Sequence, residues 1–216
     1  MTVLLFANGD LDQLDWIRPY LAKATAVIAA DGGTRHLWRL GHLPDLVVGD
    51  IDSLPQPARQ WLQLTNTPLL QAPADKDETD LELALLHIAS TYHNQKILIF
   101  AAFGGRLDQT LANIFLLAHP DLAGKRIELL TPHERAWLVT NRTEITGQIG
   151  DTVSLLPLAG DVWVRQTSGL KWPLANERLF FGPARGISNT LSAPVATVTL
   201  SSGKLICLHT YRPWDR

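Results

Sequence analysis

Residues 26–33 of the chain read Ala-Val-Ile-Ala-Ala-Asp-Gly-Gly, and residues 46–53 read Leu-Val-Val-Gly-Asp-Ile-Asp-Ser. Each stretch is a short apolar run, typical of a buried strand, that leads directly into aspartate and glycine. The arrangement occurs twice more, because residues 68–71 precede an acidic stretch at 75–80 and residues 96–101 precede Gly-Gly-Arg-Leu-Asp at 104–108. Helix-like segments separate these runs, and this alternation predicts an α/β domain with a parallel sheet and flanking helices.

The rest of the chain divides into two regions of different pattern. In the first region we expect strands at 3–7, 26–30, 46–48, 68–71 and 96–101, and helices at 11–23, 34–40, 58–64, 79–91 and 107–118. From about residue 126, short β-rich runs punctuated by Gly and Pro follow at 126–130, 136–140, 152–156, 162–166, 197–201 and 205–209. The sequence therefore predicts an α/β N-terminal domain over residues 1–133 and a smaller all-β sandwich domain over residues 134–216.

The composition argues against several classes of protein. A net charge of −2 provides no basic field for nucleic acid or an anionic membrane. No run of about 18 apolar residues could span a bilayer. The start of the chain shows no secretory signal, and the single cysteine, Cys207, cannot form an internal disulfide. We therefore expect a cytoplasmic protein that binds neither nucleic acid nor membrane.

Acidic residues are concentrated in the first half of the chain. Residues 1–110 hold 13 Asp and Glu against 8 Lys and Arg, a net −5, whereas residues 111–216 hold 8 against 11, a net +3. Because ligands of open parallel sheets bind outside the carboxyl ends of the strands, the four motifs should lie together at that edge. Such a cluster would repel a phosphate ligand unless a divalent cation intervened, so we interpret this edge as a magnesium and phosphate site.

The candidate metal ligands are five aspartates in two of the motifs: Asp50, Asp52, Asp75, Asp77 and Asp80. Asp50 and Asp52 are two residues apart, so both could reach one Mg²⁺, although a charged surface loop is the alternative. Thr79 and Glu82 have the spacing of a capping box at the start of a helix. Capping does not explain the acids at 75 and 77, and metal ligation therefore remains the better interpretation.

Glycines and basic residues complete the motifs. Asp31-Gly32-Gly33 and Gly104-Gly105 each precede a predicted helix, where small residues would let backbone N–H groups approach a phosphate, and a plain turn is the alternative. Lys76 and Arg106 are candidates for phosphate contacts, although Arg106 could instead pair with Asp108 on the surface. The chain contains neither a P-loop nor a Gly-x-Gly-x-x-Gly fingerprint, and its seven histidines show no zinc-like spacing.

In their order, the motifs resemble those of the thiamine pyrophosphokinase family over essentially the whole chain. In the first half the resemblance rests on Asp31-Gly32-Gly33, Pro44-Asp45, Gly49-Asp50-Ile51-Asp52-Ser53, Asp75-Lys76-Asp77 with Thr79-Asp80, Gly104-Gly105-Arg106-Leu107-Asp108-Gln109, and Asn113. In the second half it rests on Ser-Gly-Leu-Lys-Trp-Pro-Leu at 168–174 and Gly-Ile-Ser-Asn at 186–189. Trp172 stands where many bacterial relatives carry Tyr, which is a chemically mild departure.

The resemblance implies a reaction and a set of roles. The thiamine hydroxyl would attack the β-phosphorus of ATP with Mg²⁺ present, and AMP would leave, in a homodimer whose active sites lie between subunits. Asp52, Asp77, Arg106 and Asp108 would serve catalysis, with Asp108 orienting or deprotonating the hydroxyl. The implied nucleotide-binding residues are Asp31, Gly32, Gly33, Lys76, Thr79, Asp80, Gly104, Gly105 and Arg106. The implied thiamine-binding residues are Gln109, Trp172, Ser188 and Asn189, with a core tryptophan as the alternative for Trp172.

Two other functions are compatible with parts of the sequence. An aspartyl phosphatase would use Asp50 as nucleophile and Asp52 as acid, but it leaves the other three motifs without a role. A sensor that binds thiamine or a nucleotide without turnover would not need the full set of carboxylates. Both alternatives are therefore weaker than the transferase.

Overall fold

The structure is a computed structural model that describes residues 1–51, 54–71 and 76–211. It divides into two compact units, Met1–Pro132 and His133–Arg216, and each is described by itself. None of the described helices is long and apolar enough to cross a membrane. The α/β fold of the first unit and the all-β fold of the second confirm the predicted fold class.

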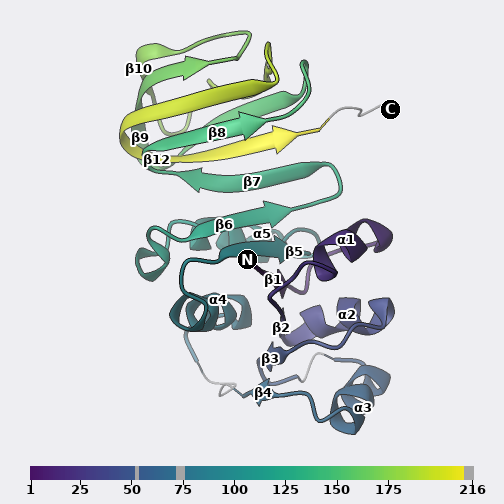
Figure 1. Ribbon diagram of the computed structural model, residues 1–216. Helices are drawn as coiled ribbons and strands as arrows, with labels where there is room; N and C mark the ends of the chain where they lie inside the picture. Colours follow the sequence, from purple (N-terminus) through teal and green to yellow (C-terminus); the bar gives the residue numbers. More distant parts are fainter. Residues whose placement is uncertain (52–53, 72–75, 212–216) are drawn as a thin grey trace. The chain divides into compact units, whose positions relative to one another are not determined.

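The first unit is built on a parallel sheet (Figure 1). Its strands, in spatial order, are β6 (Arg126–Leu130), β5 (Lys96–Phe100), β1 (Thr2–Phe6), β2 (Ala26–Ala30), β3 (Leu46–Val48) and β4 (Leu69–Leu70). From β1 the chain moves outward through β2, β3 and β4, and then returns to place β5 and β6 on the other side of β1. The strand order therefore reverses between β1 and β5, and open sheets of this kind bind ligands at that point.

Helices connect the strands of the first unit. They are α1 (Arg18–Leu21), α2 (Thr34–Leu40), α3 (Gln56–Leu64), α4 (Asp80–Thr91) and α5 (Leu107–Leu116), with short 3₁₀ turns at Asp15–Ile17, Asp31–Gly33 and Pro120–Leu122. Figure 1 shows α1, α2 and α3 on one side of the sheet and α4 on the other. Strand β2 is buried along its whole length, as expected for a strand covered by helices on both faces.

One predicted helix was too long. The structure has no helix at residues 11–14, and α1 begins only at Arg18, with Pro19 in its first turn. Proline lacks a backbone N–H and fits only the first turn of a helix, so a helix running from 11 through 19 is excluded.

The second unit consists of antiparallel strands. They are β7 (Glu134–Val139), β8 (Arg142–Thr146), β9 (Thr152–Ser168), β10 (Ala175–Leu179), β11 (Asn189–Thr190) and β12 (Val195–Thr210). The two long strands β9 and β12 pair along their length, while β8 pairs with the first part of β12 and β7 with the last part. Ile145 of β8 and Val139 of β7 belong to the same buried cluster, so the two parts of the long pair face each other across a sandwich core.

One detail of the predicted β region was wrong, because four of the expected runs are parts of only two strands. The runs 152–156 and 162–166 belong to the single strand β9, and the runs 197–201 and 205–209 belong to β12. The pairing of these strands shifts register between Thr199 and Lys204, and such bulges bend a strand without ending it. The run 126–130 is β6, which pairs in parallel with β5 and so completes the first sheet.

Histidine 209 is fully buried in the second unit, where it lies in a closed polar network. Its Nε2 lies 2.8 Å from a carboxylate oxygen of Asp151, and Arg135 Nε donates to its Nδ1 at 3.2 Å. Burial lowers the pKa of His209, and the ring is therefore neutral with its proton on Nε2. This residue is a satisfied core histidine that fixes the start of β9.

Candidate active site

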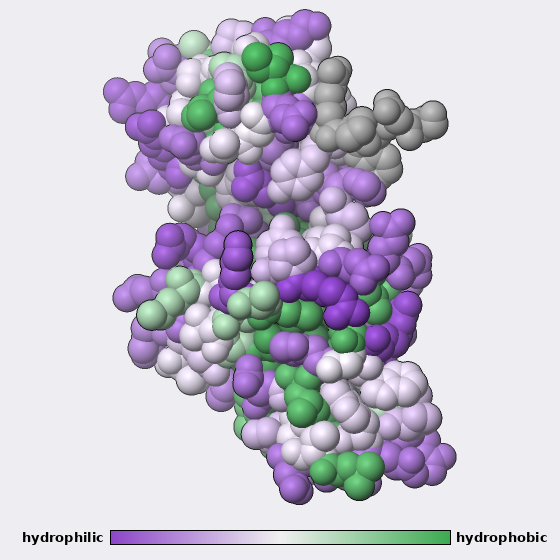
Figure 2. All heavy atoms as spheres, turned by 45° about the vertical axis from the view of Figure 1, so that its right-hand side comes forward, coloured by the Kyte–Doolittle hydropathy of each residue, from purple (hydrophilic) through white to green (hydrophobic). Residues whose placement is uncertain are grey.

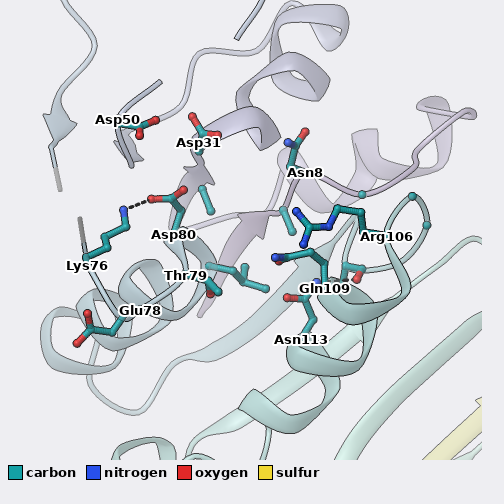
Figure 3. Close-up of a pocket in the computed structure, with 17 residues that line it drawn as sticks. Asn8, Asp31, Asp50, Lys76, Glu78, Thr79, Asp80, Arg106, Gln109 and Asn113 are labelled. Carbon is teal, nitrogen blue, oxygen red and sulfur yellow. Dashed lines mark hydrogen bonds and ion pairs between the residues drawn. The ribbon is translucent and has the colours of Figure 1, made fainter. Parts of the chain in front are cut away.

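The described part of the first unit contains a cavity of about 520 Å³ at the carboxyl edge of its sheet, where the strand order reverses (Figure 3). Segments that follow β1, β2, β3 and β5, together with the start of α4, line this cavity. The lining residues are Ala7, Asn8, Gly9, Ala30, Asp31, Asp50, Lys76, Glu78, Thr79, Asp80, Leu81, Ala102, Gly104, Gly105, Arg106, Gln109 and Asn113. All four predicted motifs contribute to this wall.

Carboxylates gather at one end of the cavity. Figure 3 shows Asp31, Asp50 and Asp80 together, although they come from three different elements. Asp31 follows β2, Asp50 follows β3, and Asp80 is the first residue of α4. Gly49 lies between them with a positive φ of 138°, and a Cβ added there would be 2.9 Å from Asp31 Cβ and 3.1 Å from Asp80 Oδ1. Only glycine leaves room for the close approach of these side chains.

The start of α4 adds a cation to the acidic end. Lys76 forms an ion pair with Asp80, and their side chains are only 14% and 27% exposed. Thr79 is the N-cap of α4, since its hydroxyl accepts the backbone N–H of Glu82 at 3.2 Å, which confirms its predicted capping position. The cap fixes the first turn of the helix and thereby holds Asp80 at the cavity.

The other end of the cavity carries amides and a guanidinium. Asn8, Arg106, Gln109 and Asn113 lie there in Figure 3. Asn113 is buried and donates to the carbonyl oxygen of Ala102 at 2.8 Å, which ties α5 to the segment after β5. The cavity is thus acidic at one end and rich in hydrogen-bond donors at the other.

Asp108 is engaged by its neighbour Arg106. Arg106 Nε donates to Asp108 Oδ1 at 3.1 Å and Nη2 bonds the second oxygen, in a pair that is largely exposed. Hydrogen bonds from Arg106 and from the backbone N–H of Gln109 lower the pKa of Asp108. A carboxylate with a lowered pKa is a weaker base, and Asp108 does not line the cavity in this arrangement.

The paired glycines after β2 serve close packing against β1. A Cβ on Gly33 would lie 2.0 Å from the carbonyl oxygen of Phe6, and one on Gly32 would lie 2.3 Å from the side chain of Asn8. Both glycines are buried and neither lines the cavity. Their small size therefore brings Asp31 and Asn8 to the same wall.

The predicted metal ligands have different positions. Asp50 and Asp80 line the cavity, whereas Asp77 is exposed outside its lining, and Asp52 and Asp75 lie outside the described residues. Among the residues that the structure describes, no three His, Cys, Asp or Glu side chains come close enough to form a metal-binding group.

The predicted thiamine-binding residues lie in both units. Gln109 lines the cavity of the first unit. In the second unit, Asn189 clamps the backbone of Trp172, because its Oδ1 accepts the Trp172 N–H at 3.1 Å and its Nδ2 donates to the Trp172 carbonyl at 2.7 Å. Trp172 itself is 54% exposed and is therefore not a core tryptophan. Ser188 precedes the clamp and donates its N–H to Ser154 Oγ at 3.0 Å.

Sequence reasoning missed the segment that follows β1. Asn8 and Gly9 line the cavity, and the carboxylate of Asp10 accepts the N–H of Gly105 at 3.1 Å. The available signal was the polar Asn-Gly-Asp triplet directly after the first apolar run, in the same position relative to its strand as the other four motifs.

These features define a two-domain α/β protein with an acidic ligand cavity at the switch point of a parallel sheet, followed by a β-sandwich. The family model "Thiamin pyrophosphokinase, catalytic domain" matches residues 17–129, and "Thiamin pyrophosphokinase, vitamin B1 binding domain" matches residues 140–205. The chain belongs to the thiamine pyrophosphokinase family.

Curated relatives and solved structures agree with this membership. Thiamine pyrophosphokinase of Bacillus subtilis is 29% identical over 209 residues, which cover 96% of this chain and 97% of the relative. Thiamine pyrophosphokinase 2 of Arabidopsis thaliana is 29% identical, with 82% of this chain and 75% of the relative covered. The crystal structure of thiamin pyrophosphokinase from Geobacillus thermodenitrificans matches with a TM-score of 0.88 at 26% identity, over 100% of both chains.

Proposed function

We propose that the protein transfers the diphosphoryl group of ATP to the hydroxyl group of thiamine, giving thiamine diphosphate and AMP. The observation that carries this proposal is the convergence of Asp31, Asp50, Lys76, Asp80 and Arg106 on one cavity, in a chain whose two halves match the two domains of the family. An aspartyl phosphatase would use only the loop of Asp50, and the family membership argues against it.

The donor chemistry of the acidic end fits Mg²⁺. Asp31, Asp50 and Asp80 bring carboxylate oxygens, the hard ligands that this cation prefers, to the same end of the cavity. The three do not form a complete ligand group by themselves, and Asp52, Asp75 and Asp77 are further candidates from the family resemblance. When bound, the cation would neutralise the charge of the ATP phosphates. Without it, the three carboxylates would repel a polyphosphate.

The protein's own residues bind and orient the reactants. Lys76 and Arg106 supply positive charge at opposite ends of the cavity for phosphate oxygens. The thiamine oxygen attacks the β-phosphorus, the bond from that phosphorus to the bridging oxygen of the α-phosphate breaks, and AMP leaves with that oxygen. The hydroxyl proton passes to a base, and Asp108 takes this role only when Arg106 turns from it towards phosphate. Arg106 therefore couples phosphate binding to release of the base.

Thiamine recognition is assigned to the exposed indole of Trp172, with Ser188, Asn189 and Gln109. We further propose a homodimer with composite sites. Its support is an exposed apolar stripe on α5, formed by Leu107, Leu111 and Phe115, which are 72%, 44% and 58% exposed and follow one another at four-residue spacing on one helix face. Exposed apolar stripes of this kind mark surfaces that are covered in an assembly.

The function is tested by incubating the purified protein with ATP, Mg²⁺ and thiamine and separating the nucleotides and thiamine esters by chromatography. The proposal requires AMP and thiamine diphosphate in equal amounts. ADP with thiamine monophosphate as the main products would refute it, and a phosphoenzyme without AMP would support the phosphatase. Binding of both ligands without any product would identify a sensor.

A further inference from the structure

The turn Asn8–Gly9–Asp10 has no assigned role in the proposed reaction, although Asn8 and Gly9 line the cavity. Its backbone is joined to the segment after β5: Gly9 N donates to Ala101 O at 2.8 Å, and Asp10 N donates to Phe103 O at 2.7 Å. A Cβ on Gly9 would lie 2.1 Å from the carbonyl oxygen of Phe103, so only glycine permits this contact. These contacts therefore fix the position of the turn relative to the segment after β5.

The side chain of Asp10 extends this connection to the glycines before Arg106. Its Oδ2 accepts the N–H of Gly105 at 3.1 Å, and a Cβ on Gly104 would lie 2.3 Å from the same oxygen. Gly104 and Gly105 both have positive φ, of 95° and 68°, which few other residues adopt. Glycines have many accessible backbone conformations, and the bond from Gly105 to the Asp10 carboxylate stabilises one of them.

Two side chains of helix α2 bind the backbone carbonyl oxygens of the Asn8–Asp10 turn. Arg35 Nη2 donates to the carbonyl oxygens of Asn8 at 3.0 Å and of Gly9 at 2.9 Å. His36 Nε2 lies 2.9 Å from the same Gly9 oxygen and 3.4 Å from Arg35 Nε. One ring nitrogen cannot both donate and accept, so the shorter contact places the proton on Nε2 as a donor to Gly9.

His36 cannot take over the role of Arg35. The histidine is buried, and burial together with the charge of Arg35 lowers its pKa to about 4. It is therefore neutral at pH 7 and bonds only one of the two carbonyls. Arg35 supplies the charge and bridges both, and lysine lacks the planar donor geometry to reproduce this contact.

We infer that Arg35 is a positioning residue for nucleotide binding: through the Asn8–Asp10 turn it holds the Gly104–Arg106 loop where Arg106 faces the phosphates. This inference rests on the proposed binding of ATP in the cavity. It predicts an effect on ATP affinity from a side chain that does not line the cavity.

The chain offers a matched control on the same helix. Arg39 Nη1 donates to the carbonyl oxygen of Leu11 at 3.1 Å, a bond of the same type to the same segment, one residue past Asp10. The variants Arg35→Met and Arg39→Met each remove one guanidinium and keep an unbranched aliphatic stem. Arg35→Met removes two bonds to carbonyl oxygens and Arg39→Met removes one, but only the first variant should loosen the Asn8–Asp10 turn.

The test measures the binding of ATP with Mg²⁺ by titration calorimetry without thiamine, together with thermal unfolding. We expect Arg35→Met to weaken ATP about tenfold, which corresponds to about 1.4 kcal/mol. Arg35→Lys should recover only part of the affinity, and Arg39→Met should stay within about twofold of the parent protein. Unchanged ATP affinity in Arg35→Met, or equal weakening by Arg39→Met, would overturn the inference.

A second variant, Asp10→Ala, tests the same connection where the turn meets the Gly104–Arg106 loop. Asp10 is exposed, so Asp10→Ala should fold even where Arg35→Met does not, and it should also weaken ATP. In the double variant the two losses should not add, because both act through one turn. Additive losses, or an unchanged or tighter Kd in Asp10→Ala, contradict the inference. Failure of the parent protein to bind ATP would instead refute the proposed function.

Discussion

The variant Trp172→Ala separates a ligand-binding tryptophan from a structural one. Trp172 follows Lys171, whose Nζ lies 4.6 Å from the centre of the indole ring. One face of the ring therefore already carries a cation, and a thiamine ring has to stack on the other. The aminopyrimidine of thiamine is neutral and suits this arrangement better than the cationic thiazolium.

The expected magnitudes follow from exposure and stacking. Truncating a fully buried tryptophan costs about 3–5 kcal/mol of stability. Trp172 is 54% exposed, so less than half of that penalty, under about 2.5 kcal/mol, is expected. Loss of stacking on a base costs about 1–3 kcal/mol of binding. The KM for thiamine should therefore rise roughly tenfold to hundredfold.

The assay is steady-state kinetics with thiamine and ATP varied in turn, combined with thermal unfolding of each variant. Asn189→Ala provides the contrast, because it deletes a buried amide that makes two bonds to the Trp172 backbone and accepts the Thr190 N–H at 2.8 Å. It should lower stability by about 2–4 kcal/mol and also raise the thiamine KM, since the indole loses its support. In both variants the KM for ATP should remain within about twofold of the parent value.

A clear drop in the melting temperature of Trp172→Ala, with an unchanged thiamine KM, would refute the assignment. The same conclusion would follow if Asn189→Ala raised the thiamine KM while Trp172→Ala did not. The intermediate variant Trp172→Phe keeps an aromatic face, so it should lie between the parent protein and the alanine variant.

Three further predictions follow from the described contacts. Gly49→Ala should lower turnover at least about tenfold, because its Cβ would lie 2.9 Å from Asp31 Cβ, whereas Gly41→Ala, also at positive φ but with nothing within 4 Å, should spare activity in the same assay. The pKa of His36 is about 4 in the folded state, below its ordinary 6.5, so its contribution to stability is complete above pH 6.5 and is lost as the pH falls towards 4. Urea unfolding should show a loss of about 2 kcal/mol between pH 7 and pH 5 that His36→Gln removes, and an unchanged pH slope would contradict this. Leu111→Glu should convert a dimer into monomers in light scattering, and persistence of the dimer would exclude the α5 stripe as its interface.

Much of the site could be predicted from local sequence. Short apolar runs that end in aspartate or glycine identified the strands, and the carboxyl edge of a parallel sheet brought Asp31, Asp50 and Asp80 together as expected. The cap at Thr79 was also readable, because a helix start depends on residues three positions apart.

Long-range contacts decided the rest. Asp10 meets Gly105 across 95 positions, and Asn189 meets Trp172 across 17, so nothing in the local pattern reveals either bond. For the same reason local sequence does not reveal what surrounds Gly32 and Gly33: their space is filled by Phe6, the last residue of β1, and by Asn8, which follows that strand.

The exposure of apolar side chains is likewise decided by the tertiary structure. Figure 2 displays apolar patches among mostly polar side chains on one face of the molecule, and sequence alone does not say which apolar residues stay exposed. The sequence by itself determined which residues carry charge, where most strands and helices lie, and the family of the protein, because these depend on residue type and near neighbours. Only the tertiary structure decided that Trp172 is exposed, that Asp10 bonds Gly105, and that Arg35 supports the cavity wall. Those facts depend on which distant segments share the same space once the sheet has formed.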